Sequence, residues 1–401
     1  MKTTYLLLCL LGIGSVSGAG QTKQPQKIGD FIESTSYNEH RRNATRSLQY
    51  TPDGDDFVCI NGKNRFTRAL YGSHTAFRLE TSDRPVFAAY TKKNPKHICF
   101  KLQTSGGTVA LDSTEHCESR YTAGRRSYNL FHPSFEGGNL SIATLVLPDK
   151  EGAIWQFNAR NFKGSNPILL ASISEIRNSK LNRNGDMGAD PADSFEAPLQ
   201  PQQLQSCPAQ IDGTLYILLE NQELRTLTTA EGETLFKKAE AARSETASRI
   251  RIETPDPYFN TLGGTLAMAA DGIWDGEVWL HGAIGWRMPL SGWRAAYTGD
   301  VLGWHDRART HFNAYAASQV TEVPNTFPHP AQDSALHLAR SVKKWGTPQY
   351  SNGYICRNPH RNNQMHHYDM NLCYIDELLW HFKWTGDLDY VRQMWPVITR
   401  H

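Results

Sequence analysis

The pattern of apolar and polar residues changes at Thr228. Upstream of it, short runs bounded by Gly, Asn and Pro alternate apolar with polar residues, as the stretch containing Ile98, Phe100 and Leu102 does. Because successive side chains of a strand point to opposite faces, this period of two gathers the apolar residues on one face. Short strands at this spacing predict a large antiparallel β-sandwich over residues 51–227.

A charged helix is predicted directly after the strands. Thr228 and Glu231 have the spacing of a capping box, and Glu233 and Lys237 lie one helical turn apart. A run that is polar all round has no broad face to bury in a core. We therefore interpret residues 228–254 as a helical linker between domains.

Residues 255–401 show helical spacing with long loops between the helices. Helices are expected from Asp256-Pro257, from about Asp300, over Asp333–Trp345, over Met370–Trp384, and from Asp387 to a break near Pro396. The faces expected to be buried carry Phe259, Leu262, Leu266, Ala269, Ala270 and Ile273; then Val301, Trp304, Ala308, Phe312 and Tyr315; then Leu372, Ile375, Leu379 and Phe382. Long loops inside a compact domain usually carry function, so we look for chemistry between these helices.

The N-terminus has the composition of an export signal. Lys2 precedes the apolar run Tyr5–Ile13 and small residues follow, so we predict a signal peptide over residues 1–19 and a flexible segment over residues 20–50. No later segment is apolar over enough residues to span a bilayer. The expected location is the periplasm or the exterior of a bacterial cell. The six cysteines after the signal are compatible with disulfides or with free buried thiols.

Charge and aromatic content narrow the classes of partner. The net charge of +2 gives no strong field for binding nucleic acid. Only Trp155 of the ten tryptophans precedes residue 270, and two Trp-Arg pairs follow, Trp286-Arg287 and Trp293-Arg294. A Trp ring stacks on the apolar face of a sugar, and Arg offers a donor fork for hydroxyls or a uronate. Cation–π packing of an ordered loop is the alternative explanation for these pairs.

A second candidate site lies where a polar loop runs into a helix. The start of a helix favours an ionised carboxylate, so Asp369 should have a lowered pKa and suits a base or a water-orienting group; the alternative is a simple N-cap. Asn371 follows it, and His366 and His367 precede it as candidate substrate-binding residues. Cys356, His360, His366, His367 and Asp369 could be metal ligands, but Cys-x3-His followed by His-His matches no tight zinc spacing, so we predict no metal and no cofactor.

The order of sandwich, helical linker and helical hairpins resembles the six-hairpin (α/α)6 glycoside hydrolases. The phrase Leu379-Trp-His-Phe-Lys-Trp-Thr-Gly-Asp387 resembles the recurrent hairpin signature of that superfamily, and Tyr297-Thr-Gly-Asp300 resembles an earlier copy. The resemblance implies a multidomain β + α fold: an N-terminal antiparallel β-sandwich, a helical linker and an incomplete (α/α)6 helical toroid. A toroid needs about twelve helices. We therefore expect residues 255–401 to be its N-terminal part.

Two members of the superfamily are nearest in motif. The segment from Tyr368 to Asn371 is similar to the Asn-Ile-Asn segment of inverting α-L-fucosidases, with Asp369 in place of the first Asn. The α-L-rhamnosidase type places an acidic pair before its Trp-Thr-Gly-Asp, and this chain has Gly292-Trp-Arg294 there instead.

The resemblance implies an exported, inverting exo-glycosidase acting on an oligo- or polysaccharide. In that reading Asp369 and Asn371 position the attacking water, and the general acid is expected beyond residue 401. It leaves open whether this chain is active alone. A non-catalytic glycan-binding protein and a polysaccharide lyase remain alternatives.

Overall fold

The computed structural model describes residues 50–401, all within one unit of the chain, residues 48–401. The description leaves gaps at 63–65, 73, 75, 91–95, 165, 176–202, 283–287, 323–326, 330–331, 334–337, 340–342, 346–351 and 361–367. At 66–67, 203–204, 368–369 and in the strands between 327 and 345 the backbone alone is described. The predicted signal peptide and the flexible segment up to residue 49 therefore lie outside the described residues.

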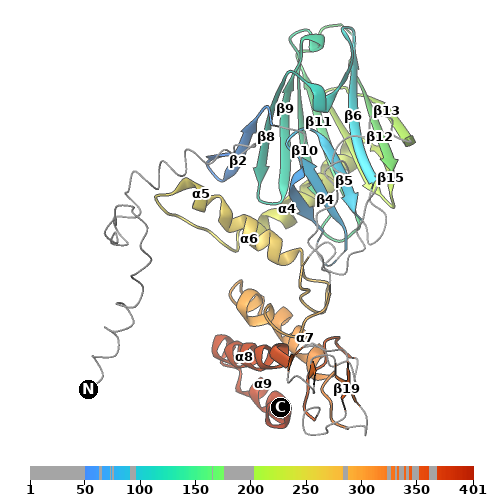
Figure 1. The fold of residues 1–401 in the computed structure, drawn as a ribbon. Coiled ribbons are helices and arrows are strands. Elements are labelled where there is room, and N and C mark those ends of the chain that lie inside the picture. The colour runs from blue at the N-terminus through green and yellow to red at the C-terminus, as the bar shows by residue number, and fades with distance from the viewer. Residues whose placement is uncertain are drawn as a thin grey trace, which may run out of the picture. The chain divides into compact units, whose positions relative to one another are not determined.

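Two antiparallel sheets fill the described residues from 51 to 227 (Figure 1). The first has the order β1 (Thr51–Asp53), β2 (Asp56–Ile60), β8 (His116–Thr122), β9 (Arg125–Phe131), β10 (Asn139–Val146), β11 (Gly152–Arg160), β14 (Thr214–Glu220) and β15 (Glu223–Leu227). The second has the order β13 (Gln203–Gln210), β12 (Ile168–Glu175), β6 (Lys96–Thr104), β5 (Val86–Tyr90), β4 (Arg78–Ser82) and β3 (Phe66–Tyr71), with β7 (Gly107–Ala110) also beside β6. The predicted antiparallel β region is confirmed.

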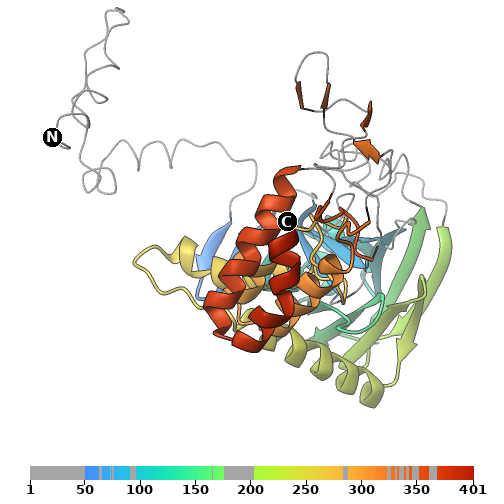
Figure 2. The ribbon, with the colours of Figure 1, turned by 90° about the horizontal axis from the view of Figure 1, so that it is seen from below.

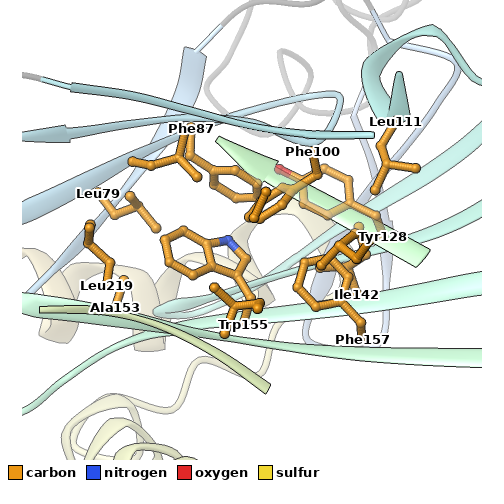
Figure 3. Packing of buried hydrophobic residues seen from close by; sticks show 14 of the residues in the cluster. Leu79, Phe87, Phe100, Leu111, Tyr128, Ile142, Ala153, Trp155, Phe157 and Leu219 are labelled. Carbon is orange, nitrogen blue, oxygen red and sulfur yellow. The ribbon is translucent and has the colours of Figure 1, made fainter. Parts of the chain in front are cut away.

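The side chains between these sheets form the core that the alternation predicted. Ile98, Phe100 and Leu102 of β6 are all buried there. Trp155 of β11 stands among them and meets the rings of Phe87 and Phe100 edge-on, with centroid distances of 5.4 and 5.6 Å (Figure 3). Edge-to-face pairs of this kind add roughly 0.5–1.5 kcal/mol each beyond the area that they bury.

Helix α4 (Thr229–Ala247) begins at the predicted capping box. The Thr228 hydroxyl accepts from the Glu231 amide while the Glu231 carboxylate accepts from the Thr228 amide. The interpretation of this helix as a polar linker without a core role was wrong in one respect. Gly232 and Ala239 are buried, and α4 packs against β14 through the ring of Tyr216. A narrow stripe of small residues is enough for a helix to lie flat on a sheet, even when its other faces are charged.

The later helices are α5 (Pro257–Asn260), α6 (Leu262–Asp271), the π-helix η4 (Ala295–Asp300), α7 (His305–Ala316), α8 (Tyr368–Thr385) and α9 (Leu388–Arg400). Asp256 caps α5 as predicted, because its carboxylate accepts from the Tyr258 amide. Helices α8 and α9 lie side by side (Figure 2). Helix α9 continues through Pro396, where the sequence predicted a break. The described helices include this hairpin but do not by themselves show a toroid.

The helix predicted over Asp333–Trp345 is wrong. The described residues there form two nested antiparallel pairs: β16 (Phe327–His329) with β19 (Lys343–Trp345), and β17 (Gln332–Asp333) with β18 (Leu338–Ala339). Prolines at 324, 328, 330 and 348 surround the segment and remove backbone donors. A helix this short is marginal without tertiary packing, so the local spacing could not hold it.

Two predicted helix faces need correction. In α6 the buried side is made by Gly263, Ala267 and Ala270, whereas Leu266, like Phe259 before it, is exposed. In the segment ending with α7, the predicted face is confirmed for Trp304, Ala308, Phe312 and Tyr315 but not for Val301, which is exposed. Small residues rather than large ones form the α6 contact because the helix lies close to its neighbours. In the described part of the chain, no helix is long and apolar enough to cross a membrane.

Candidate functional site

Helix α8 faces its neighbours with a polar stripe that the sequence did not predict. Its buried residues include Asn371, Tyr374, Glu377, Leu378 and His381. The predicted face is only partly buried: Leu372 is 68% exposed and Leu379 is exposed as well, whereas Ile375 and Phe382 pack against the core. The Tyr374 hydroxyl donates to the Phe312 carbonyl of α7 at 2.8 Å, which fixes the rotation of the helix. Polar anchors, not apolar spacing, decide which side of α8 is buried.

The start of α8 carries the predicted catalytic residues. Asp369 is the second residue of the helix, where the sequence placed it, and its side chain lies outside the described residues. Asn371 is 3% exposed, and the oxygen and nitrogen of its side-chain amide both bond to the backbone of a single residue. Its oxygen accepts from the Ile355 amide at 2.6 Å, and its nitrogen donates to the Ile355 carbonyl at 3.2 Å. Asn371 therefore positions the loop of residues 352–360 against the helix.

One of the two Trp-Arg pairs meets this same part of α8. Gly292 lies so close that a Cβ atom there would be 2.6 Å from the Cβ of Cys373 and 3.2 Å from the Met370 carbonyl. The next residue, Trp293, has a left-handed φ of 74°. Arg294 donates to the carbonyls of Trp293 and His281, at 3.0 and 3.2 Å. The candidate substrate-binding residues Trp286, Arg287, His366 and His367 lie outside the described residues.

A carboxylate and an imidazole pair on the same two loops. Glu277, in the loop after α6, is bonded to His360, and about half of each side chain is exposed. The turn that presents Glu277 is held by Asp275, whose carboxylate accepts from the amides of Glu277 and Val278. No local pattern in the sequence predicts this pair, because its members are 83 residues apart.

Positive charge lies around these carboxylates. The pKa of His281 is lowered by burial and, to a smaller extent, by Arg294 and Arg357. Burial raises the pKa of the Tyr315 hydroxyl well above its ordinary value, and the charges of Asp275 and Arg357 act on it in opposite directions. The two loops therefore place guanidinium groups within electrostatic reach of carboxylates. Such a mixed surface can bind hydroxyls and a sugar carboxylate together.

Helix α8 buries one further carboxylate, that of Glu377. Its side chain is buried, and one carboxylate oxygen accepts from the amides of Ala296 and Tyr297 at the start of η4, at 2.9 and 3.4 Å. Burial raises its pKa to about 7, while the bonds from the backbone act in the opposite direction. Its neighbour Asp376 stays exposed and bonds to the Tyr297 hydroxyl. Glu377 thus anchors the segment that follows Trp293 and Arg294.

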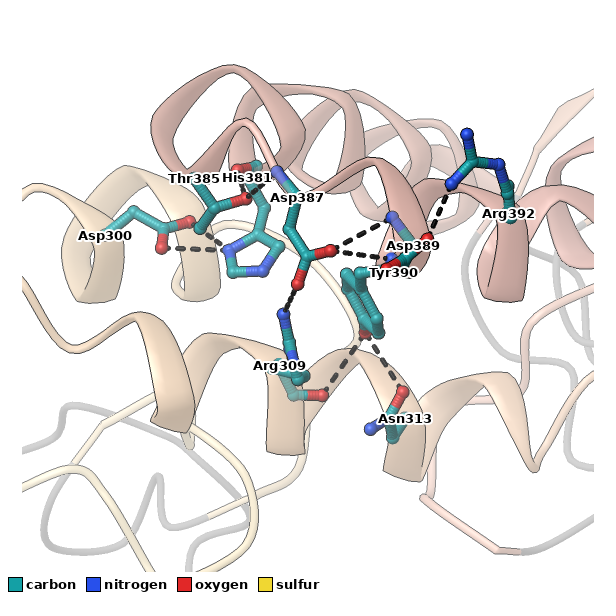
Figure 4. A network of polar contacts seen from close by, with 9 residues as sticks. All are labelled: Asp300, Arg309, Asn313, His381, Thr385, Asp387, Asp389, Tyr390 and Arg392. Atoms are coloured by element: carbon teal, nitrogen blue, oxygen red, sulfur yellow. Dashed lines mark hydrogen bonds and ion pairs between the residues drawn. The ribbon is translucent and has the colours of Figure 1, made fainter.

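The Thr-Gly-Asp motif at the end of α8 has a structural role (Figure 4). Gly386 takes a φ of 64° and ends the helix. Asp387 then caps α9 by accepting from the amides of Asp389 and Tyr390, at 3.0 and 2.9 Å, and it pairs with Arg309 of α7. These bonds lower the pKa of Asp387, the Tyr390 amide most and Arg309 next. The motif ends one helix, begins the next and ties both to a third.

Comparison with known proteins bears on the sandwich and not on this site. A family model described as a domain of unknown function, DUF4450, matches residues 95–250. The match begins at β6 and ends just after α4, before the loops described above. No curated protein matches the chain.

Proposed function

We propose that this protein acts on glycans as a hydrolase of glycosidic bonds, with its site at the start of α8. The observation that carries the proposal is the packing of Gly292 on the first turns of α8. It brings together two segments that the sequence singled out independently: the Trp293-Arg294 pair and the helix start with Asp369 and Asn371.

The resemblance to six-hairpin glycosidases supports the same proposal. A β-sandwich precedes helices, and the signature around Asp387 forms a helical hairpin, α8 with α9, that is tied to α7. Such hairpins present loops from helix ends, and loops positioned by a rigid scaffold commonly carry binding and catalytic residues. Export stays a prediction from the N-terminal sequence.

In this proposal each group has a chemical task. Trp293, together with Trp286, stacks on sugar rings, and the arginines that follow them bind hydroxyls or a uronate. Asp369 holds the attacking water as a base. Asn371 acts through Ile355, so it is a positioning residue. Inversion needs an acid opposite the base. The half-exposed Glu277 with its His360 partner is the described carboxylate that suits this second task.

A glycan-binding protein without catalysis is the second candidate. It is favoured by the engagement of Asn371 with Ile355 and of Arg294 with backbone carbonyls, since neither amide nor guanidinium is then fully available for chemistry. The stacking platform would remain in that case.

One experiment separates these candidates. The purified full chain is incubated with a panel of oligo- and polysaccharides while reducing ends are assayed, and binding is measured in parallel by calorimetry. For a hydrolase, Asp369→Asn and Glu277→Gln each reduce turnover at least 100-fold and keep binding, and Trp293→Ala weakens binding. Trp395→Ala, an exposed tryptophan of α9, is the matched control and changes neither.

Each other outcome decides against hydrolysis. Binding without new reducing ends favours the binding protein. A product that absorbs as an unsaturated uronide identifies a lyase instead. Neither binding nor turnover, or full turnover in both carboxylate variants, contradicts the proposed site.

A further inference from the structure

Three potential metal ligands converge at the other end of α8. Asp300 is the last residue of η4, His305 is the first of α7, and His381 lies in the last turns of α8. The Nδ1 atom of His381 is 2.9 Å from both oxygens of Asp300, and that of His305 is 2.7 Å from one of them. One ligand atom from each residue lies within 4.8 Å of the others. Figure 4 shows Asp300 and His381 pointing toward each other.

A bound cation would compensate the buried carboxylate of Asp300. The side chains of Asp300 and His381 are fully buried, and a buried carboxylate is costly unless it is paired. Among the described residues, the ion pairs of Asp300 are with these two imidazoles, which carry a charge only when protonated. The nearby arginines of α7 have other partners: Arg307 pairs with Asp271, and Arg309 pairs with Asp387.

We propose that Asp300, His305 and His381 bind one divalent transition-metal ion of the Zn²⁺ class. Two imidazole nitrogens and one carboxylate oxygen form a borderline donor set that suits zinc rather than calcium or magnesium. Zinc lies about 2.0–2.2 Å from such donors, so the three donor atoms move apart slightly when the ion enters. The side chain of His305 is 41% exposed and can turn to allow this.

The surroundings hold the imidazoles in the orientation that the site needs. The ring of His381 packs between Phe312 and Tyr390, with a centroid distance of 5.4 Å to each. Its Nε2 atom is buried without a hydrogen-bond partner among the described residues, so Nδ1 carries the polar interaction of this ring. His305 lies against the ring of Trp384. The ring of His381 is thus oriented by packing before an ion binds, whereas the more exposed ring of His305 can adjust to the ion.

The metal would join η4, α7 and α8 and would not take part in the proposed hydrolysis. His381 is twelve residues beyond Asp369 on α8, which places the two about 18 Å apart along the helix axis. The inference therefore stands independently of the proposed function. It also differs from the sequence-based prediction of no metal, for which the candidate ligands were Cys356, His360, His366, His367 and Asp369.

Metal titration of the full chain tests the proposal. After removal of any affinity tag and treatment with a chelator, the protein is titrated with ZnCl₂ by calorimetry and with Co²⁺ by visible absorption. We expect one equivalent to bind and the melting temperature to rise. His305→Ala removes a ligand from the exposed side, where it should not prevent folding, and should weaken Zn²⁺ binding at least tenfold and abolish the rise in melting temperature. Asp300→Asn should act likewise.

His360→Ala is the matched control, because it removes another half-exposed histidine that is bonded to a carboxylate. It should bind Zn²⁺ as the unaltered protein does. Failure of the unaltered protein to bind either Zn²⁺ or Co²⁺ would overturn the proposal. So would equal affinity and equal thermal stabilisation in His305→Ala, which would place the bound ion elsewhere.

Discussion

The β-sandwich and the helical region bury ionisable residues in different ways. Between the sheets the core is made of aliphatic and aromatic side chains around Trp155, and the buried Asp83 of this region forms an ion pair with the buried Arg126 at 3.2 Å. In the helical region ionisable groups share the core with tryptophans, and Glu377, His381 and His311 are all fully buried. Burial lowers the pKa of His311 to about 4, so at neutral pH it is uncharged, and its Nδ1 accepts from the Trp279 amide.

This difference shows what fixes each kind of element. A strand in the sandwich has two faces, and its alternation decides which one is buried. A helix can rotate about its axis, and in α8 the bonds of Asn371 and Glu377 to distant backbone groups set that rotation. The apolar residues Leu372 and Leu379 are then left exposed.

The largest expected effect tests the apolar half of the comparison. Trp155→Ala removes a fully buried indole that two phenylalanine rings surround, which should cost about 3–5 kcal/mol of unfolding free energy. Urea denaturation followed by circular dichroism measures it. Trp395→Ala is the control: this tryptophan is 56% exposed on α9, and its loss should change the unfolding free energy by about 0.5 kcal/mol or less. Equal losses in the two variants would mean that the sandwich core does not depend on this ring.

Local signals in the sequence predicted much of the secondary structure. The alternation of apolar and polar residues located strands such as β6. The capping residues Thr228, Asp256 and Asp387 each lie directly before a helix in the structure. These signals work because each depends on residues only a few positions apart. The segment 333–345 shows their limit, since its helical spacing gave way to strand pairing.

The sites depend on contacts that no local signal contains. Glu277 and His360 are 83 residues apart, and Asp300 and His381 are 81 apart. The sequence could identify Asp369 as a helix-start residue and Trp293-Arg294 as a loop pair. It could not show that Gly292 brings the two together, because that contact follows from how α8 is rotated.

The second prediction tests the polar half of the comparison through pH. Glu377 has an ordinary pKa of 4.5 and a pKa of about 7 in the folded protein, because it is buried. Between these values the folded state holds the proton more tightly than the unfolded state, so stability falls as pH rises. The resulting loss of unfolding free energy is about 3 kcal/mol; it is complete above pH 7 and absent below pH 4.5. Glu377→Gln should remove this part of the pH dependence.

Unfolding free energies of the two proteins, measured in urea from pH 4.5 to 8, give the difference directly. Glu245→Gln replaces an exposed glutamate of α4 and should keep the slope of the unaltered protein. An unchanged slope in Glu377→Gln would show that this carboxylate is solvated and would weaken the contrast between the two cores.

The smallest effect concerns α4, which stands between the two regions in sequence. If α4 were a solvated linker, Gly232→Ala would stabilise its helix by about 1 kcal/mol. In the structure, a Cβ atom at position 232 would lie 2.2 Å from the Tyr216 ring, so the helix must shift away from β14. We therefore expect a loss of about 1–3 kcal/mol instead. Ser244→Ala, at an exposed position of the same helix, should be neutral or slightly stabilising. If both variants are stabilised in thermal unfolding, α4 does not pack on the sandwich. If Gly232→Ala is destabilised and Ser244→Ala is not, α4 is packed as part of the sandwich.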